Sequence, residues 1–83
     1  MHQIKLDVEK NLAIVDLSTF FYPLHILQQA AAEFKGIAKI SIKNSGNRAI
    51  VCISPKGKEK AGETALHFCN FALALKRELG QHA

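Results

Sequence analysis

Apolar and charged residues alternate at the start of the chain with the two-residue period of a strand that buries one face. Residues 4–8 follow this pattern, and Lys10-Asn11 then offers a tight turn, because Asn tolerates the positive φ of a hairpin. A second strand follows over residues 12–17, with an upper limit at Phe21. The start of the chain therefore predicts a β-hairpin.

The next segment has the 3.6-residue period of a helix with one apolar side. Pro23 suits its first turn, since proline fixes φ and needs no amide partner there, and Gly36 predicts its end. The apolar side consists of Leu24, Ile26, Leu27, Ala30, Ala31 and Phe34. We also expect Phe20, Phe21 and Tyr22, which come just before this helix, to enter the core.

The second half of the chain repeats this order of elements. Residues 38–43 alternate again, and residues 44–47 form a turn. Residues 49–54 make a mostly apolar strand, which we expect to lie centrally in the sheet. Pro55 ends this strand because proline cannot donate to a ladder. A solvated loop then leads into a helix over roughly residues 62–79.

These elements predict an α+β domain with the order ββαββα: one four-stranded, mainly antiparallel sheet with two helices packed on one face. Residues 1–83 form a single domain, because 83 residues have no room for a second core. With 48% hydrophobic and 22% charged residues, the composition is that of a globular chain. No run approaches about 18 apolar residues and no apolar signal core precedes the first strand, so we expect a cytoplasmic protein that does not bind membranes.

The last helix has an apolar arc that is too wide for one buried face. At roughly 100° per residue the arc covers about 220° of the helix wheel, against roughly 100° for an ordinary surface helix. We expect part of the arc to pack on the sheet and the first helix through Phe68, Ala72, Leu75 and Leu79. An 83-residue chain has little material to cover the rest, so the arc predicts a second surface.

The candidate partner-binding residues lie along the far edge of this arc and are Leu66, Asn70, Leu73 and Arg77. Leu66 and Leu73 are expected to be partly exposed in a lone monomer and to contact a protein or peptide partner or a second copy of the chain. The alternative for the two polar residues is structural: Asn70 faces solvent, and Arg77 pairs with a carboxylate or caps the last turn.

Motifs for catalysis, metals and cofactors are missing from the sequence. The four histidines are too far apart for a local metal motif, and there is no Cys-x-x-Cys. Gly57 and Gly62 have the spacing of a phosphate-binding loop, but Glu63-Thr64 replaces the Lys-Ser/Thr that such a loop needs. Cys52 and Cys69 fall on apolar patterns and are expected to be buried thiols without a disulfide. We therefore expect no enzyme activity, no cofactor and no metal.

The basic residues support one alternative function. The formal net charge of +4 permits an acidic partner. Lys39, Lys43 and Arg48 could share the open face of the sheet, with the lysines of residues 56–60 beyond its end, as in a nucleic-acid-binding domain. Sheets that bind single strands stack bases on exposed aromatic residues, however, and the third and fourth strands contain none. Basic residues that solvate the open face are the favoured interpretation.

Three segments of the chain carry a resemblance to a known family. They are Tyr22, Leu24, Leu27, Ala31 and Phe34 in the first helix, Val51-Cys52-Ile53-Ser54-Pro55-Lys56 at the end of the last strand, and Phe68-x-Asn70-x-x-Leu73-x-x-x-Arg77 in the last helix. Over about residues 17–77 the chain resembles the HxsD-like family, the small proteins of the His-Xaa-Ser repeat peptide-modification systems.

The resemblance implies an accessory protein that works beside radical SAM enzymes, which modify a small repeat peptide, and that carries no cluster of its own. Asn70 and Arg77 then become candidate contact residues. The residues by themselves favour the same class, a small non-enzymatic module that binds a protein or peptide partner, or a second copy, through its C-terminal helix. A small basic nucleic-acid-binding domain is the alternative.

Overall fold

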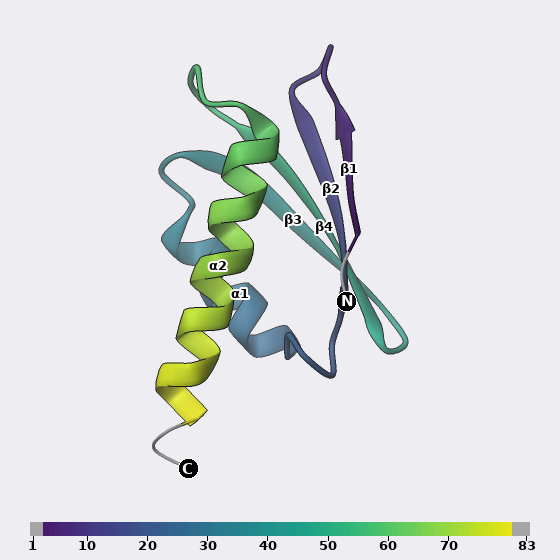
Figure 1. Ribbon diagram of the computed structural model, residues 1–83, viewed down its shortest axis with the longest axis vertical. Helices are drawn as coiled ribbons and strands as arrows, with labels where there is room; N and C mark the ends of the chain where they lie inside the picture. Colours follow the sequence, from purple (N-terminus) through teal and green to yellow (C-terminus); the bar gives the residue numbers. More distant parts are fainter. Residues whose placement is uncertain (1–2, 81–83) are drawn as a thin grey trace.

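The chain forms two β-hairpins, each followed by a helix, and the predicted ββαββα order of an α+β fold is confirmed (Figure 1). The computed structural model describes residues 3–80. The elements are β1 (Gln3–Asp7), β2 (Leu12–Ser18), α1 (Leu24–Glu33), β3 (Ala38–Ser45), β4 (Arg48–Pro55) and α2 (Ala61–Gly80). The four strands form one antiparallel sheet in the order β1-β2-β4-β3. The mostly apolar β4 is therefore a central strand, as its sequence predicts.

Both hairpin turns use a residue in the left-handed region. Asn11 has a φ of 50° at the end of the first turn, and Gly46 has a φ of 60° in the two-residue loop between β3 and β4. Asparagine and glycine are the residues that adopt this conformation at least cost. The predicted turn at Lys10-Asn11 is confirmed, and the second turn is shorter than the four residues that the sequence indicates.

The segment between β2 and α1 corrects one prediction about the core. β2 ends at Ser18, whose carbonyl accepts hydrogen bonds from the N–H groups of Phe21 and Tyr22, at 3.2 and 2.8 Å. This turn points Phe20 and Phe21 outward, and 82% and 51% of their surfaces are exposed. Tyr22 alone of the three aromatic residues packs against the core. The pattern of apolar and polar residues could not show this turn, because the turn is formed by backbone hydrogen bonds.

α1 begins where the sequence predicts and ends earlier. The carbonyl of Pro23 accepts the N–H of Ile26 at 3.0 Å, which starts the helix. The helix ends at Glu33, and Phe34 closes it through a 3.1 Å bond to the carbonyl of Ala30. Gly36, the predicted stop, lies two residues past Phe34, the C-cap of the helix.

The core lies between the sheet and the two helices, which cover the same face of the sheet (Figure 1). Alternate residues of the two central strands point into it: Ala13, Val15 and Leu17 of β2, and Ala49, Val51 and Ile53 of β4. Phe68 is the largest fully buried side chain, and its ring meets that of Phe34 edge to face, with the centroids 5.5 Å apart. This aromatic pair joins α1 to α2.

The inward face of α2 differs from the prediction at its last turn. Phe68 and Ala72 are buried and Leu75 packs against the core, but 43% of the surface of Leu79 is exposed. Figure 1 shows the reason, since the C-terminal end of α2 runs past the end of the sheet. The apolar side of α2 therefore extends further along the helix axis than the core against which it packs.

We expect Phe68→Ala to lower the free energy of unfolding by about 3–5 kcal/mol, because it empties a fully enclosed site between α1, α2 and the sheet. Urea denaturation monitored by circular dichroism measures the change. Phe20→Ala is the matched control, and its effect should stay within about 0.5 kcal/mol because this ring is exposed. Equal effects of the two variants would contradict the placement of the core.

Candidate functional site

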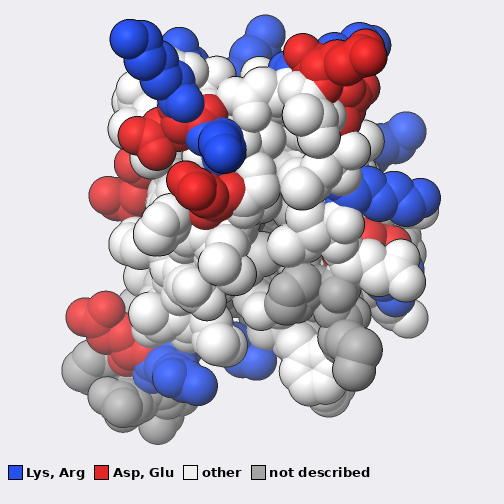
Figure 2. All heavy atoms as spheres, turned by 45° about the horizontal axis from the view of Figure 1, so that its top comes forward, with Lys and Arg blue, Asp and Glu red and all other residues white. Residues whose placement is uncertain are grey.

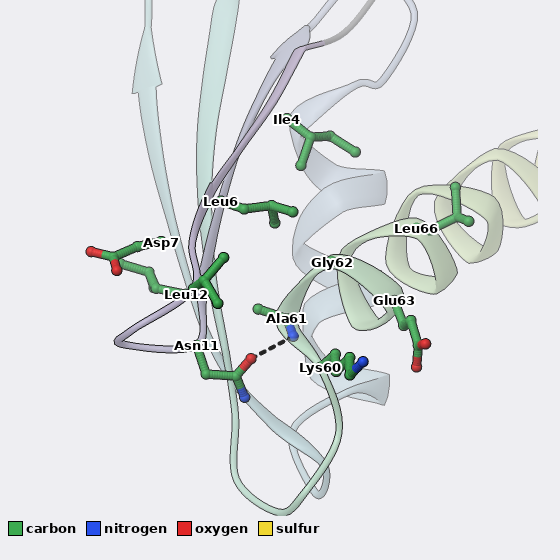
Figure 3. A pocket seen from close by; sticks show the side chains of 11 residues that line it. Ile4, Leu6, Asp7, Asn11, Leu12, Lys60, Ala61, Gly62, Glu63 and Leu66 are labelled. Atoms are coloured by element: carbon green, nitrogen blue, oxygen red, sulfur yellow. Dashed lines mark hydrogen bonds between the residues drawn. The ribbon is translucent and has the colours of Figure 1, made fainter.

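An apolar groove runs between β1 and the N-terminal half of α2 (Figure 3). α2 packs mainly on β2 and β4, and α1 packs on β3, so the helix-facing side of β1 has little cover. The groove has a volume of about 830 Å³. Its apolar lining consists of Ile4, Leu6, Val8 and Leu12 from the first hairpin and Ala61, Gly62 and Leu66 from α2.

Three large apolar side chains in this groove are open to solvent. The exposed fractions are 54% for Leu6, 86% for Val8 and 54% for Leu66. Figure 3 shows Ile4 and Leu6 projecting from β1 toward α2. Figure 2 shows side chains of both charges around an uncharged central area on one side of the molecule. An apolar patch with a polar rim is typical of an interaction site.

One side chain fixes the end of the groove where α2 begins. The Asn11 side-chain oxygen accepts the N–H of Ala61 at 2.8 Å, and its nitrogen donates to the carbonyl of Glu59, also at 2.8 Å. The first bond satisfies one of the N–H groups that every helix leaves unpaired at its start. Asn11 thus caps α2 from another element and ties it to the β1–β2 turn.

The close approach of α2 to β1 depends on a glycine. A Cβ atom at Gly62 would lie 3.2 Å from Cδ1 of Leu6, which is tighter than an ordinary van der Waals contact. A larger residue at this position would push the Leu6 side chain or the helix aside. Gly62 therefore contributes to the width of the groove.

The structure brings one of the sequence-predicted site residues into this groove. Leu66 lines it, whereas Leu73 is half-buried on the same side of α2, two turns further on. Asn70 and Arg77 are exposed, and their side chains have no hydrogen-bond or ion-pair partner among residues 3–80. Of the two structural alternatives, Asn70 does face solvent, and Arg77 makes no ion pair within the described part of the chain.

The sequence did not indicate that β1 contributes to the site. The alternation of Ile4, Leu6 and Val8 predicts a strand with one apolar face, and the structure contains it as β1, which ends at Asp7, one residue before Val8. The alternation alone could not show that α2 leaves this face of the strand open. The missing information was which two of four strands the helix covers.

The basic residues of the alternative function lie together on the open face of the sheet. The register places Lys43 of β3 opposite Ile50 of β4, with Lys39 and Arg48 on the same face. The guanidinium of Arg48 forms an ion pair with Asp16 of β2, with Nε and Oδ1 2.7 Å apart. Part of the positive charge on this face is therefore already neutralised.

The two cysteines lie in different environments, which corrects the expectation that both are buried. Cys69 is buried, and its burial raises the pKa of the thiol to about 11. Burial also raises the pKa of Tyr22, with a smaller contribution from Cys69. Cys52 is half-buried, because its side chain lies on the sheet face that no helix covers. Both thiols are free.

Within residues 3–80, no three His, Cys, Asp or Glu side chains come close enough together to hold a metal ion. Neither described helix combines the length and the apolar character that crossing a membrane requires. The groove is the feature of the described structure that most resembles a binding site.

Comparisons with models of protein families, with curated proteins and with solved structures gave no match to this chain.

We expect one thiol of the native protein to react with Ellman's reagent at pH 8 within minutes, and the second to react only in denaturant. The reactive group should be Cys52, because Cys69 is buried and its raised pKa keeps the thiol protonated at that pH. Absorbance at the wavelength of the released dye counts the thiols. Cys52→Ser should abolish the fast phase, and a fast phase that survives in this variant would contradict the burial of Cys69.

We expect Asn11→Ala to lower the free energy of unfolding by about 2–3 kcal/mol, because it removes two hydrogen bonds and places alanine at a positive φ. Asn11→Gly removes the same bonds but tolerates this φ, so it should be about 1 kcal/mol less destabilising. Urea denaturation of the two variants measures both contributions. An unchanged stability of Asn11→Ala would show that the bonds do not hold α2 in place.

Proposed function

We propose that this protein is a small non-enzymatic module that binds a protein or peptide partner in the groove between β1 and α2. The observation that carries the proposal is the convergence of Leu6, Val8 and Leu66, each more than half exposed, on one groove. Covering them would remove apolar surface from water, which stabilises a complex by roughly 25 cal/mol per Å² before the costs of association.

The shape of the groove favours an extended segment as the ligand. Its floor is β1 and the start of the turn after it, along which Ile4, Leu6 and Val8 repeat every second residue. An extended segment with apolar side chains at every second position has the same spacing and can meet all three. The volume of about 830 Å³ is that of a site for a short segment and not for a whole domain.

Charged groups at the rim can orient such a segment. Glu63 supplies negative charge beside the groove, and Lys60 supplies positive charge. The two polar atoms of the Asn11 side chain are engaged in holding α2. The polar groups of the groove therefore support recognition better than they support chemistry on a bound molecule.

The resemblance to the HxsD-like family supports a biological setting for this module. In that setting the partner is a component of a peptide-modification system, either the peptide or the radical SAM enzyme that modifies it. Asn70 and Arg77 continue along α2 from Leu66, so a longer partner can extend from the groove onto these exposed polar residues.

Selection of binders from a displayed library of random 12-residue peptides tests the proposal without knowledge of the natural partner. The enriched peptides should carry apolar residues at alternate positions. Leu66→Asp should weaken their binding at least tenfold, because it places a charge in the groove. Fluorescence polarisation with one labelled enriched peptide measures the affinities.

The matched control is Leu79→Asp, which places the same charge at another exposed leucine of α2, outside the groove. This variant should bind the peptide like the unmodified protein. Equal binding by the Leu66 and Leu79 variants, or a selection that enriches no peptide, would contradict the proposal. A salt-dependent shift of a 20-nucleotide oligonucleotide, lost in Lys43→Glu, would then favour the basic face as the site.

A further inference from the structure

β1 is an edge strand whose outer side is open. It bonds to β2 on one side, and no other strand of residues 3–80 pairs with it on the other. Every second residue of such a strand turns its N–H and C=O groups outward, where another strand can bond to them. Figure 1 shows β1 at the sheet edge, with α2 set back from it.

The sequence of this edge is complementary to itself. Residues 4–7 of β1 and Val8, the first residue of the turn after it, read apolar, basic, apolar, acidic, apolar. If two copies run antiparallel and are centred on Leu6, then Leu6 lies opposite Leu6, Lys5 opposite Asp7 and Ile4 opposite Val8 of the other copy. Opposite charges and apolar pairs that face each other across strands are each stabilising.

Other registers lose this complementarity. Centring the pair on Lys5 places two lysines opposite each other, and centring it on Asp7 does the same with two carboxylates. A shift by one residue puts apolar side chains of one copy opposite charged side chains of the other. The register centred on Leu6 is therefore strongly preferred.

We propose that two copies of this chain pair through β1, antiparallel and centred on Leu6, to form one continuous eight-stranded sheet. This goes beyond the proposed function, since it concerns the outer edge of β1 and needs no peptide. The two-fold axis lies at Leu6 and keeps all four helices on one face of the sheet. Each Lys5 then meets the Asp7 of the other copy, on the open face.

The helices leave room for this pairing. α2 packs on β2 and β4, so the two α2 helices of the pair are separated by about four strand spacings. At roughly 4.8 Å per spacing this is about 19 Å, about twice the distance between packed helices. The helices do not collide, and the two grooves join into one trough floored by both copies of Ile4, Leu6 and Val8.

β3, the other edge of the sheet, has neither an open row of apolar side chains nor a charge pattern that is complementary to itself. The helix-facing side chains of β3, Ile40 and Ile42, pack against the core, so this edge has no open apolar row. β3 contains two lysines and no acidic residue, so no antiparallel register of two copies pairs opposite charges. The chain therefore offers one edge for self-pairing, and it is β1.

Sedimentation equilibrium with charge-reversal variants tests the proposal. Lys5→Asp turns both Lys–Asp pairs of the dimer into repulsive ones and should raise the dissociation constant of the dimer by at least about tenfold. The double variant Lys5→Asp with Asp7→Lys exchanges the two charges, keeps the pairs attractive and should restore the dissociation constant to within about threefold of the original.

The controls separate association from folding. Lys43→Asp reverses the same charge on the other edge strand and should leave the dissociation constant unchanged. Asp7 also accepts the N–H of Lys10 at 3.2 Å, and the double variant removes this hydrogen bond. The melting temperature of each variant is therefore measured, so that a loss of folding is not taken for a loss of association. A similar weakening by Lys43→Asp, or no restoration in the double variant, would overturn the proposed register.

The test also distinguishes this proposal from the proposed function. Leu66→Asp should weaken peptide binding at least tenfold and leave the dimer intact, because Leu66 lies on α2 and not on the strand edge. A protein that stays monomeric at several hundred micromolar would overturn self-pairing and would leave the peptide site standing.

Discussion

The position of α2 over the sheet depends on the two hydrogen bonds of the Asn11 side chain. They join the β1–β2 turn to the residues on either side of the start of α2, about fifty positions further along the chain. Asn11 itself has a positive φ of 50°, and its side chain reaches from the hairpin to the start of the helix. Because the helix begins at this anchor, its path across the sheet is set from the β1 end.

The groove follows from the way two helices share four strands. A helix about 10 Å wide covers about two strands that are roughly 4.8 Å apart. α2 lies over the two central strands and α1 lies over β3, which leaves β1 without a helix of its own. Small residues on the inner face of α2, Ala61, Ala65 and Ala72, allow it to lie close to the sheet. The packing of α2 on the two central strands completes the core and also leaves Leu6 and Val8 exposed.

The fold was predictable because the residue patterns report local structure directly. Alternation identified β1 and β3, Pro23 marked the start of α1, and the apolar character of residues 49–54 identified the central strand β4. The exposed edge of α2 at Leu66 was also predictable, since its apolar arc is wider than one buried face.

What the patterns could not show depends on geometry between elements. Leu79 matches the inward face of α2, yet the sheet ends before the helix does. Cys52 matches an apolar strand, yet a central strand has a second face, and no helix covers it here. Phe20 and Phe21 match a core segment, yet a turn at Ser18 points them outward. A one-dimensional pattern contains neither the lengths nor the directions that decide these cases.

The glycine at the wall of the groove has a consequence for how such a protein could diversify. Gly62 has no side chain, and it takes no part in the hydrogen bonds of Asn11 or in the Phe34–Phe68 ring contact. Its missing Cβ nevertheless lies in contact range of Leu6. Selectivity for the size of a bound side chain can therefore change at one position while the scaffold stays constant.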